Sequence, residues 1–90
     1  MSNDHILDAG LKIWRDEGLD KVTLRSIAEA LNITHPGILY HFKTVALLKD
    51  AIAAHAVAVG ETKVIRQLIV SEHESVKHFN QSERHQYLLN

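Results

Sequence analysis

The sequence predicts an all-α fold, in which a helix-turn-helix head of three helices is followed by two or three further helices. The 90 residues include one proline and four glycines, so few residues oppose helix formation. Apolar residues recur at offsets of three, four and seven, the spacing of a helix face buried against a core. The segment from Thr23 to Phe42 has the pattern of two short helices around a tight turn. Since no segment alternates like a strand, we expect no β-sheet.

The first helix is expected to run from Asn3 or Asp4 to Glu17 and to end at Gly18. Glycine adopts the left-handed conformation that ends many helices without a steric penalty. Trp14 lies within the apolar stripe of this helix, where an indole usually belongs to the core. We therefore interpret the first helix as scaffold.

The second helix is expected to begin near Leu24, with Thr23 as its N-cap. The threonine hydroxyl can accept a hydrogen bond from an early backbone N–H of the helix. One apolar stripe would face the core. It consists of Leu24, Ile27, Ala28 and Leu31.

A tight turn and a third helix are expected next. Asn32 can adopt the left-handed conformation, and Thr34 is a second hydroxyl N-cap. The third helix would begin at about His35, with Pro36 in its first turn, where the missing N–H is harmless. Two of its residues are assigned to the core, Ile38 and Phe42.

A fourth helix is expected from about Val45 to Val59, because apolar residues recur there at helical offsets. Gly60 then indicates a break, although one helix continuing through Gly60 would cost only about 1 kcal/mol. The apolar stripe of the fourth helix consists of Leu48, Ala51, Ile52, His55, Ala56 and Val59.

A fifth helix is expected from Glu61 to about Phe79, and a short sixth helix from Ser82, as its cap, to Leu89. Their apolar surface exceeds what one neighbouring helix would cover, so we expect it to pair two chains. The expected dimer-interface residues are Ile65, Leu68, Ile69, Val76, Phe79, Tyr87 and Leu88.

No repeat, low-complexity tract or flexible linker divides the chain. We therefore expect a single domain over residues 1–90, with a helix-turn-helix part at 1–45 and a helical dimerisation part at 46–90. A chain of this size hides only about 60% of its unfolded surface. Burial of further surface between two chains would therefore stabilise it.

The segment from Ile6 to Ile52 resembles the DNA-binding domain of the TetR family of bacterial regulators. The first part matches the family phrase of a glycine, a threonine and an Ile-Ala pair, here Gly18, Thr23 and Ile27-Ala28. The second part matches the recognition helix and the start of the next helix. The residues that carry this second match are Tyr40, His41, Phe42, Lys43 and Leu48.

Two residues depart from the family pattern. Leu39 stands where many members have a tyrosine that contacts a DNA phosphate, and Val45 stands where members usually have a lysine. Family members also usually continue into a larger ligand-binding and dimerisation domain, whereas this sequence ends at Asn90. The resemblance implies DNA binding, with fewer phosphate contacts than is usual.

The charge along the chain is uneven. The formal net charge is −1, but a nucleic-acid binder is defined by the field at its contacting face. From Lys21 to Lys49 there are four basic residues and one acidic residue, Glu29, a local net charge of +3. This balance favours a modestly positive surface over the helix-turn-helix, although a solvated helical surface without a partner would have the same charge.

Nine residues are the expected DNA contacts. Phosphate contacts fix the register of a protein on DNA, and contacts to base edges or thymine methyl groups specify the sequence. Tyr40 and His41 have a second interpretation, in which they only close the domain, and Gly37 either permits a tight turn or lets the backbone approach DNA. The expected phosphate contacts are Thr23, Arg25, Thr34, Tyr40 and Lys43, and the expected base contacts are His35, Gly37, Leu39 and His41.

The sequence gives little support for a metal site, an enzyme active site or a membrane segment. There is no cysteine, and the seven histidines show no ligand spacing typical of a metal site. No phosphate-binding loop, nucleophile elbow or carboxylate pair is present, so we expect neither an enzyme nor a cofactor. The N-terminus lacks a basic region followed by an apolar run, and no apolar stretch reaches the length of a membrane span. A bacterial cytoplasmic protein, associated with the nucleoid through DNA, is expected.

The sequence thus predicts a sequence-specific transcriptional regulator that acts as a ligand-independent homodimeric repressor on a palindromic operator. Control would come from its concentration or from a partner regulatory protein. Two alternatives remain open. One is a protein-interaction module on a helix-turn-helix scaffold, and the other is an effector-sensing or truncated regulator of the TetR type.

Overall fold

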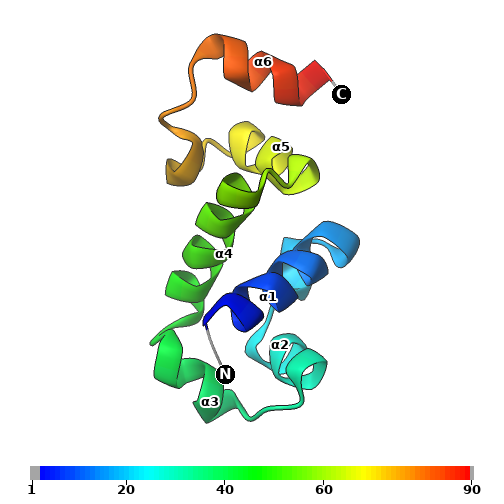
Figure 1. Ribbon diagram of the computed structural model, residues 1–90, viewed down its shortest axis with the longest axis vertical. Helices are drawn as coiled ribbons and strands as arrows, with labels where there is room; N and C mark the ends of the chain where they lie inside the picture. The colour runs from blue at the N-terminus through cyan, green and yellow to red at the C-terminus, as the bar shows by residue number, and fades with distance from the viewer. Residues whose placement is uncertain (1–2, 90) are drawn as a thin grey trace.

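The computed structural model describes residues 3–89, and every regular element within them is helical (Figure 1). The all-α prediction is confirmed. The molecule measures 41 × 21 × 19 Å, with α1 to α3 at one end, α5 and α6 at the other, and α4 spanning the two. None of the described helices is long and apolar enough to cross a membrane. The elements are α1 (Asn3–Glu17), η1 (Leu19–Lys21), α2 (Leu24–Leu31), α3 (His35–His41), α4 (Val45–Val59), α5 (Thr62–Val70), η2 (Glu74–Val76) and α6 (Gln81–Leu89).

The head is built on the crossing of α1 and α4. A Cβ atom added to Gly10 of α1 would collide with Ile52 Cδ1 of α4 and would lie 3.0 Å from Ile52 Cγ1. Ile6 and Ile52 are both fully buried beside this crossing. Gly10 therefore lets the two helices approach closely, a role that the sequence pattern did not indicate.

Three of the described α-helices begin with a side-chain cap, and two predicted hydroxyl caps are not formed. Thr23 Oγ1 accepts from Ser26 N at 3.0 Å, and Thr44 Oγ1 accepts from Leu47 N at 3.1 Å. Asn80 Oδ1 accepts from Glu83 N at 2.8 Å, so α6 is capped by Asn80 and not by the expected Ser82. Thr34 occupies the N-cap position of α3, but its hydroxyl makes no capping hydrogen bond.

Three helices end on a residue with left-handed backbone. Asn32 (φ 57°) follows α2 and Gly60 (φ 74°) follows α4, both as predicted. Glu72 (φ 56°) plays the same part after α5, where the N–H of the following residue, His73, donates to Leu68 O at 2.9 Å. Gly18 differs, because its φ of 104° and ψ of 161° are not those of a left-handed helical cap.

The predicted fifth helix from Glu61 to Phe79 is therefore wrong in length. α5 ends at Val70, and the turn at Glu72 sends the chain back so that Val76, in η2, is fully buried. His73 closes this turn, with Nδ1 accepting from Ser75 N at 3.1 Å and Nε2 lying 3.3 Å from Asp50 Oδ1 of α4. Burial of Val76 and these local hydrogen bonds replace the helical turns that the pattern favoured.

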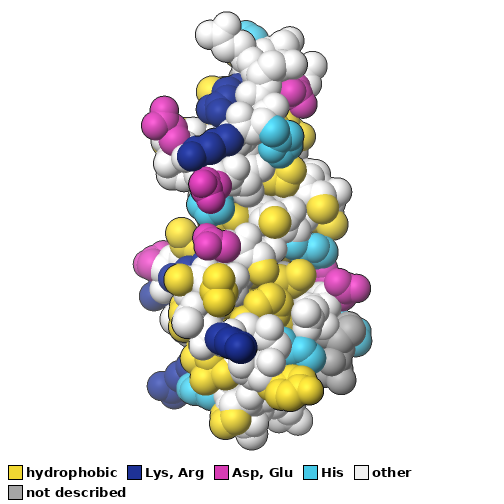
Figure 2. All heavy atoms as spheres, turned by 90° about the vertical axis from the view of Figure 1, so that its left-hand side faces the viewer, with side chains coloured by type: hydrophobic (Ala, Val, Ile, Leu, Met, Phe, Trp, Pro, Cys, Tyr) yellow, Lys and Arg dark blue, Asp and Glu magenta, His cyan; other side chains and the backbone are white. Residues whose placement is uncertain are grey.

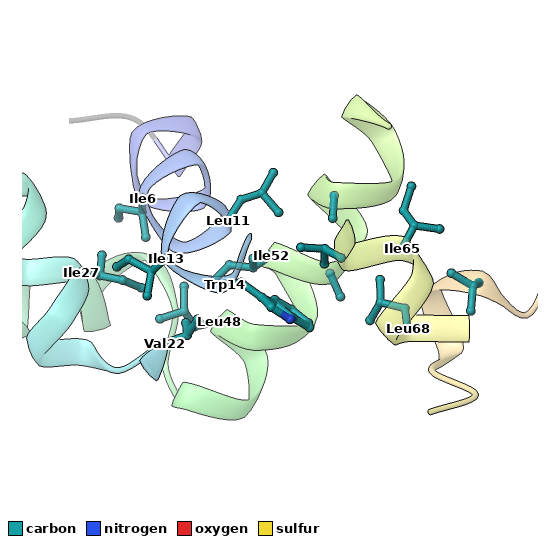
Figure 3. Packing of buried hydrophobic residues seen from close by; sticks show 14 of the residues in the cluster. Ile6, Leu11, Ile13, Trp14, Val22, Ile27, Leu48, Ile52, Ile65 and Leu68 are labelled. Atoms are coloured by element: carbon teal, nitrogen blue, oxygen red, sulfur yellow. The ribbon is translucent and has the colours of Figure 1, made fainter. Parts of the chain in front are cut away.

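One cluster of buried apolar side chains runs through both ends of the molecule. In Figure 3, Trp14 lies between the head residues around Ile27 and the α5 residues Ile65 and Leu68. Trp14 is 3% exposed, as predicted, and its Nε1–H donates to Gln67 Oε1 at 2.8 Å. Val59, predicted to lie in the buried stripe of α4, is instead 58% exposed.

The core takes up most of the residues expected at a dimer seam. Ile65, Leu68, Ile69 and Val76 are 0–5% exposed within the single chain. They fill the space between α4, α5 and η2, so they offer no free side-chain surface to a second chain. Phe79 and Tyr87 are half-buried, and only Leu88 of the expected set is exposed.

Candidate nucleic-acid interface

The third helix, α3, presents one face to the core and the rest to solvent. It lies at the end of the molecule, between α2 and α4 in the chain (Figure 1). Ile38 is fully buried, and Phe42 just beyond the helix is half-buried. These two core assignments are confirmed. The opposite face carries Pro36 and Tyr40, four residues apart and therefore neighbours on the helix surface, and Tyr40 is 84% exposed.

The two flanks of α3 bring together the expected base-contacting residues in pairs. His35 and Leu39 are exposed on one flank, and Gly37 and His41 are half-buried on the other. The rings of Tyr40 and His41 meet edge to face with centroids 5.2 Å apart. Because Tyr40 stands out from the surface, it does not close the domain.

Gly37 is not required by the packing of the head. A Cβ atom added there would meet Thr34 Oγ1 at 3.6 Å, an ordinary contact distance. Its backbone is not among the positive-φ glycines. Neither space nor backbone conformation within the single chain therefore requires glycine at this position.

The first turn of α2 holds two expected phosphate contacts that already have partners. Thr23 and Ser26 form a reciprocal capping box, in which Ser26 Oγ also lies 2.8 Å from Lys21 O. Arg25 pairs with Glu29 one turn later, at 3.1 Å, and both side chains are largely exposed. An exposed pair of this kind contributes little to stability. Arg25 can therefore exchange Glu29 for a phosphate at small cost.

The link between α3 and α4 contributes exposed residues next to the same surface. Lys43 and Thr44 are exposed, and Leu47, one turn into α4, is 53% exposed. Of these, only Lys43 was expected. The cap pattern of a threonine before an apolar helix could have identified Thr44, whereas the exposure of Pro36 and Leu47 follows only from the packing of α3 and α4.

On the face of the head that Figure 2 shows, the side chains are mainly basic or uncharged. Figure 2 shows Lys, Arg and His side chains among hydrophobic ones at the lower end, where the head lies, while acidic side chains appear mainly above it. At the C-terminal end of α1, the hydrogen bond from Arg15 lowers the pKa of Asp16, and the same contact raises the pKa of Arg15. That pair lies beside Glu61, at the start of α5. Among residues 3–89, no three His, Asp or Glu side chains are grouped so that they could hold a metal ion.

Comparison with known proteins gives consistent matches over this region. The family model described as "Bacterial regulatory proteins, tetR family" matches residues 6–56. The class D tetracycline repressor protein of Escherichia coli is 31% identical over 58 residues, which is 64% of this chain and 27% of that protein. The class G tetracycline repressor protein of Vibrio anguillarum is 34% identical over 47 residues, 52% of this chain and 22% of that protein.

These matches cover only part of each relative. The chain spans about a quarter of the length of the curated relatives it matches, 27% for class D. No solved structure matches the chain significantly.

Proposed function

The chain belongs to the tetR family of bacterial regulatory proteins, and we propose that it binds DNA as a homodimeric transcriptional repressor in the bacterial cytoplasm. Each subunit would place α3 in the major groove of one half of a two-fold symmetric operator. Bound there, the dimer would block a promoter.

The observation that carries this proposal is the solvent-facing surface of α3. A helix with Ile38 buried and Pro36, Leu39 and Tyr40 exposed has side chains free to contact base edges. Major-groove readout by α-helices uses such side chains, together with phosphate contacts that fix the register. The apolar character of Leu39 and Pro36 suits contact with thymine methyl groups.

Phosphate contacts would come from both sides of α3. We propose Thr23 and Arg25 at the start of α2, Thr34 just before α3, Tyr40 on α3 and Lys43 before α4, with Thr44 added from the geometry. His35, Gly37, Leu39 and His41 would contact the bases. With Leu39 and Val45 at two positions where the family usually has phosphate-binding residues, this surface supports weaker non-specific binding than is usual.

Dimerisation would use the exposed apolar residues at the end opposite the head. Val70 is 74% exposed, Leu88 48% and Leu89 69%. Because Leu68 and Ile69 are core residues, aspartate at either position would unfold the chain instead of separating two subunits. Leu88→Asp tests dimerisation without changing the core, because Leu88 is exposed. We expect it to shift a dimer toward monomer in sedimentation experiments while the helical content is kept.

Two modes of control are compatible with the family. We propose ligand-independent binding, because Ala53, Ala56, Val64 and Ile65 fill the space between α4 and α5. An effector-sensing regulator is the second candidate, and it is favoured by relatives that are named tetracycline repressors and are about four times as long as the matched segment. A small molecule that releases the purified 90-residue chain from DNA would decide for the second candidate.

Selection of bound duplexes from a random pool, followed by anisotropy titrations at several salt concentrations, tests the proposed function. Lys43→Ala should weaken binding to the selected and a scrambled duplex alike and reduce the salt slope by about one unit. His35→Ala should cost about 1 to 3 kcal/mol on the selected duplex and little on the scrambled one.

Failure to enrich any sequence would contradict sequence-specific binding and favour a protein-interaction module on the same scaffold. Equal losses for His35→Ala on both duplexes would move His35 to the phosphate-contacting set. Lys63→Ala on α5, an exposed lysine far along the chain from α3, is the matched control and should leave both affinities unchanged.

A further inference from the structure

A side-chain hydrogen bond joins α1 to α4 beside their close crossing. His55 Nε2 of α4 lies 2.7 Å from Asp8 Oδ1 of α1. The His55 side chain is 17% exposed, and Asp8 is 66% exposed. The pair therefore lies at the edge of the buried crossing, where one partner is largely shielded from water.

The apolar crossing alone fixes the distance between α1 and α4 better than their angle. Hydrophobic contacts at Gly10 and Ile52 are non-directional, so they resist separation more than rotation about the contact. A hydrogen bond has a preferred length and direction. The Asp8–His55 contact, placed beside the crossing, therefore resists rotation of α4 against α1.

The position of α3 depends on this angle. Only Phe42, Lys43 and Thr44 connect α3 to α4, and Thr44 caps α4 by accepting from Leu47 N. α3 therefore follows the first turn of α4. At about 1.5 Å per residue, His55 lies about 4.5 Å from Ile52, whereas Val45 lies about 10 Å from it on the other side. If α4 rotates as a rigid rod about Ile52, a displacement at His55 is roughly doubled at Val45.

We infer that Asp8 and His55 form a positioning contact for DNA binding, which holds α4 at the angle that places α3 correctly against the groove. This inference rests on the proposed function. DNA-reading side chains must be held to within about 0.5 Å, so loss of this contact would weaken specific binding although neither residue touches DNA.

The test compares affinities for the duplex that the wild-type chain selects from a random pool. Asp8→Ala and His55→Ala should each weaken binding about three- to tenfold, the range expected for the net contribution of one hydrogen bond. The double variant should be no weaker than either single variant, because both remove the same contact. His55→Gln, which keeps a donor, should stay within about twofold of the wild type.

A second histidine–aspartate contact supplies the matched control. His73 Nε2 lies 3.3 Å from Asp50 Oδ1, on the side of α4 that faces η2. Asp50→Ala removes a contact of the same type without touching α1 and leaves the His73 cap of η2 in place. We expect its specific affinity to stay within about twofold of the wild type.

The outcomes separate this inference from the proposed function. A wild-type chain that selects no duplex overturns both. A wild-type chain that binds, with Asp8→Ala and His55→Ala within twofold of it, overturns the positioning contact alone, as would an equal loss for Asp50→Ala. Should His55→Ala fail to fold by circular dichroism, the exposed Asp8→Ala variant decides the question.

Discussion

The head and the C-terminal helix α6 are attached to the molecule in different ways. α1, α2 and α4 each bury apolar side chains in one core, among them Ile6, Ile27 and Ile52 at 0% exposure. α6 has no buried residue. It is attached by the Phe79–Tyr87 ring stack, with centroids 5.6 Å apart, and by arginine hydrogen bonds to backbone carbonyls.

This difference indicates which part of the molecule is the more rigid. Burial of apolar surface couples the helices of the head into one cooperative unit, whereas a helix attached by one ring stack and a few hydrogen bonds opens at a lower free energy. The surface that we propose for DNA is therefore on the rigid part. The exposed leucines that we propose for pairing are on the part that is easiest to displace.

The largest expected effect is a loss of stability in the head. Ile52→Ala removes a fully buried side chain at the α1–α4 crossing, and we expect a loss of about 2–5 kcal/mol in the free energy of unfolding. Leu88→Ala on α6, which is 48% exposed, should change it by less than about 0.5 kcal/mol. Denaturant unfolding followed by circular dichroism measures both, and similar losses would contradict the comparison.

A smaller effect is expected at Gly10. Overpacking against Ile52 lowers the free energy of unfolding by about 1–3 kcal/mol, and the better helix propensity of alanine offsets about 1 kcal/mol of this loss. Gly10→Ala should therefore destabilise the chain by about 1 kcal/mol and weaken specific DNA binding, since it forces α1 and α4 apart. Gly60→Ala, at φ 74° with open space around it, is a control in which only backbone strain acts. An unchanged midpoint of unfolding for Gly10→Ala would show that Ile52 moves aside freely.

The threonine caps refine the comparison within the head. Thr44→Ala removes a capping hydrogen bond of 3.1 Å and should cost about 1 kcal/mol of stability. Thr34→Ala removes none, so its stability should change by only a few tenths of a kcal/mol. If Thr34 contacts a phosphate, its variant should lose DNA affinity without losing stability. Measuring both quantities on both variants separates the roles.

The smallest global effect is expected from α6. Arg84→Gln loses hydrogen bonds to Phe79 O and Val76 O, each 3.2 Å long. We expect faster amide hydrogen exchange in α6, with the free energy of unfolding lowered by less than about 1 kcal/mol. Amides of α1 should exchange as in the wild type. Equal acceleration in α1 would mean that α6 belongs to the same cooperative unit.

Local signals in the sequence were sufficient for much of the fold. Asn32 and Gly60 are residue types that favour left-handed backbone, and both end a helix as predicted. Glu72 takes the same conformation after α5 without such a residue type. The sequence therefore predicted a helix through that point, whereas burial of Val76 against the core and the hydrogen bonds of His73 make the turn favourable.

By itself, the sequence determined the all-α fold, the helix-turn-helix head and the assignment of Ile38 and Phe42 to the core, because helix caps and apolar periodicity act between neighbours in the chain. The tertiary structure decided what depends on distant residues. It placed Ile65, Leu68, Ile69 and Val76 in the core of one chain, brought Gly10 against Ile52, and set His55 beside Asp8. The physical reason is that an apolar stripe specifies burial but does not specify which surface covers it.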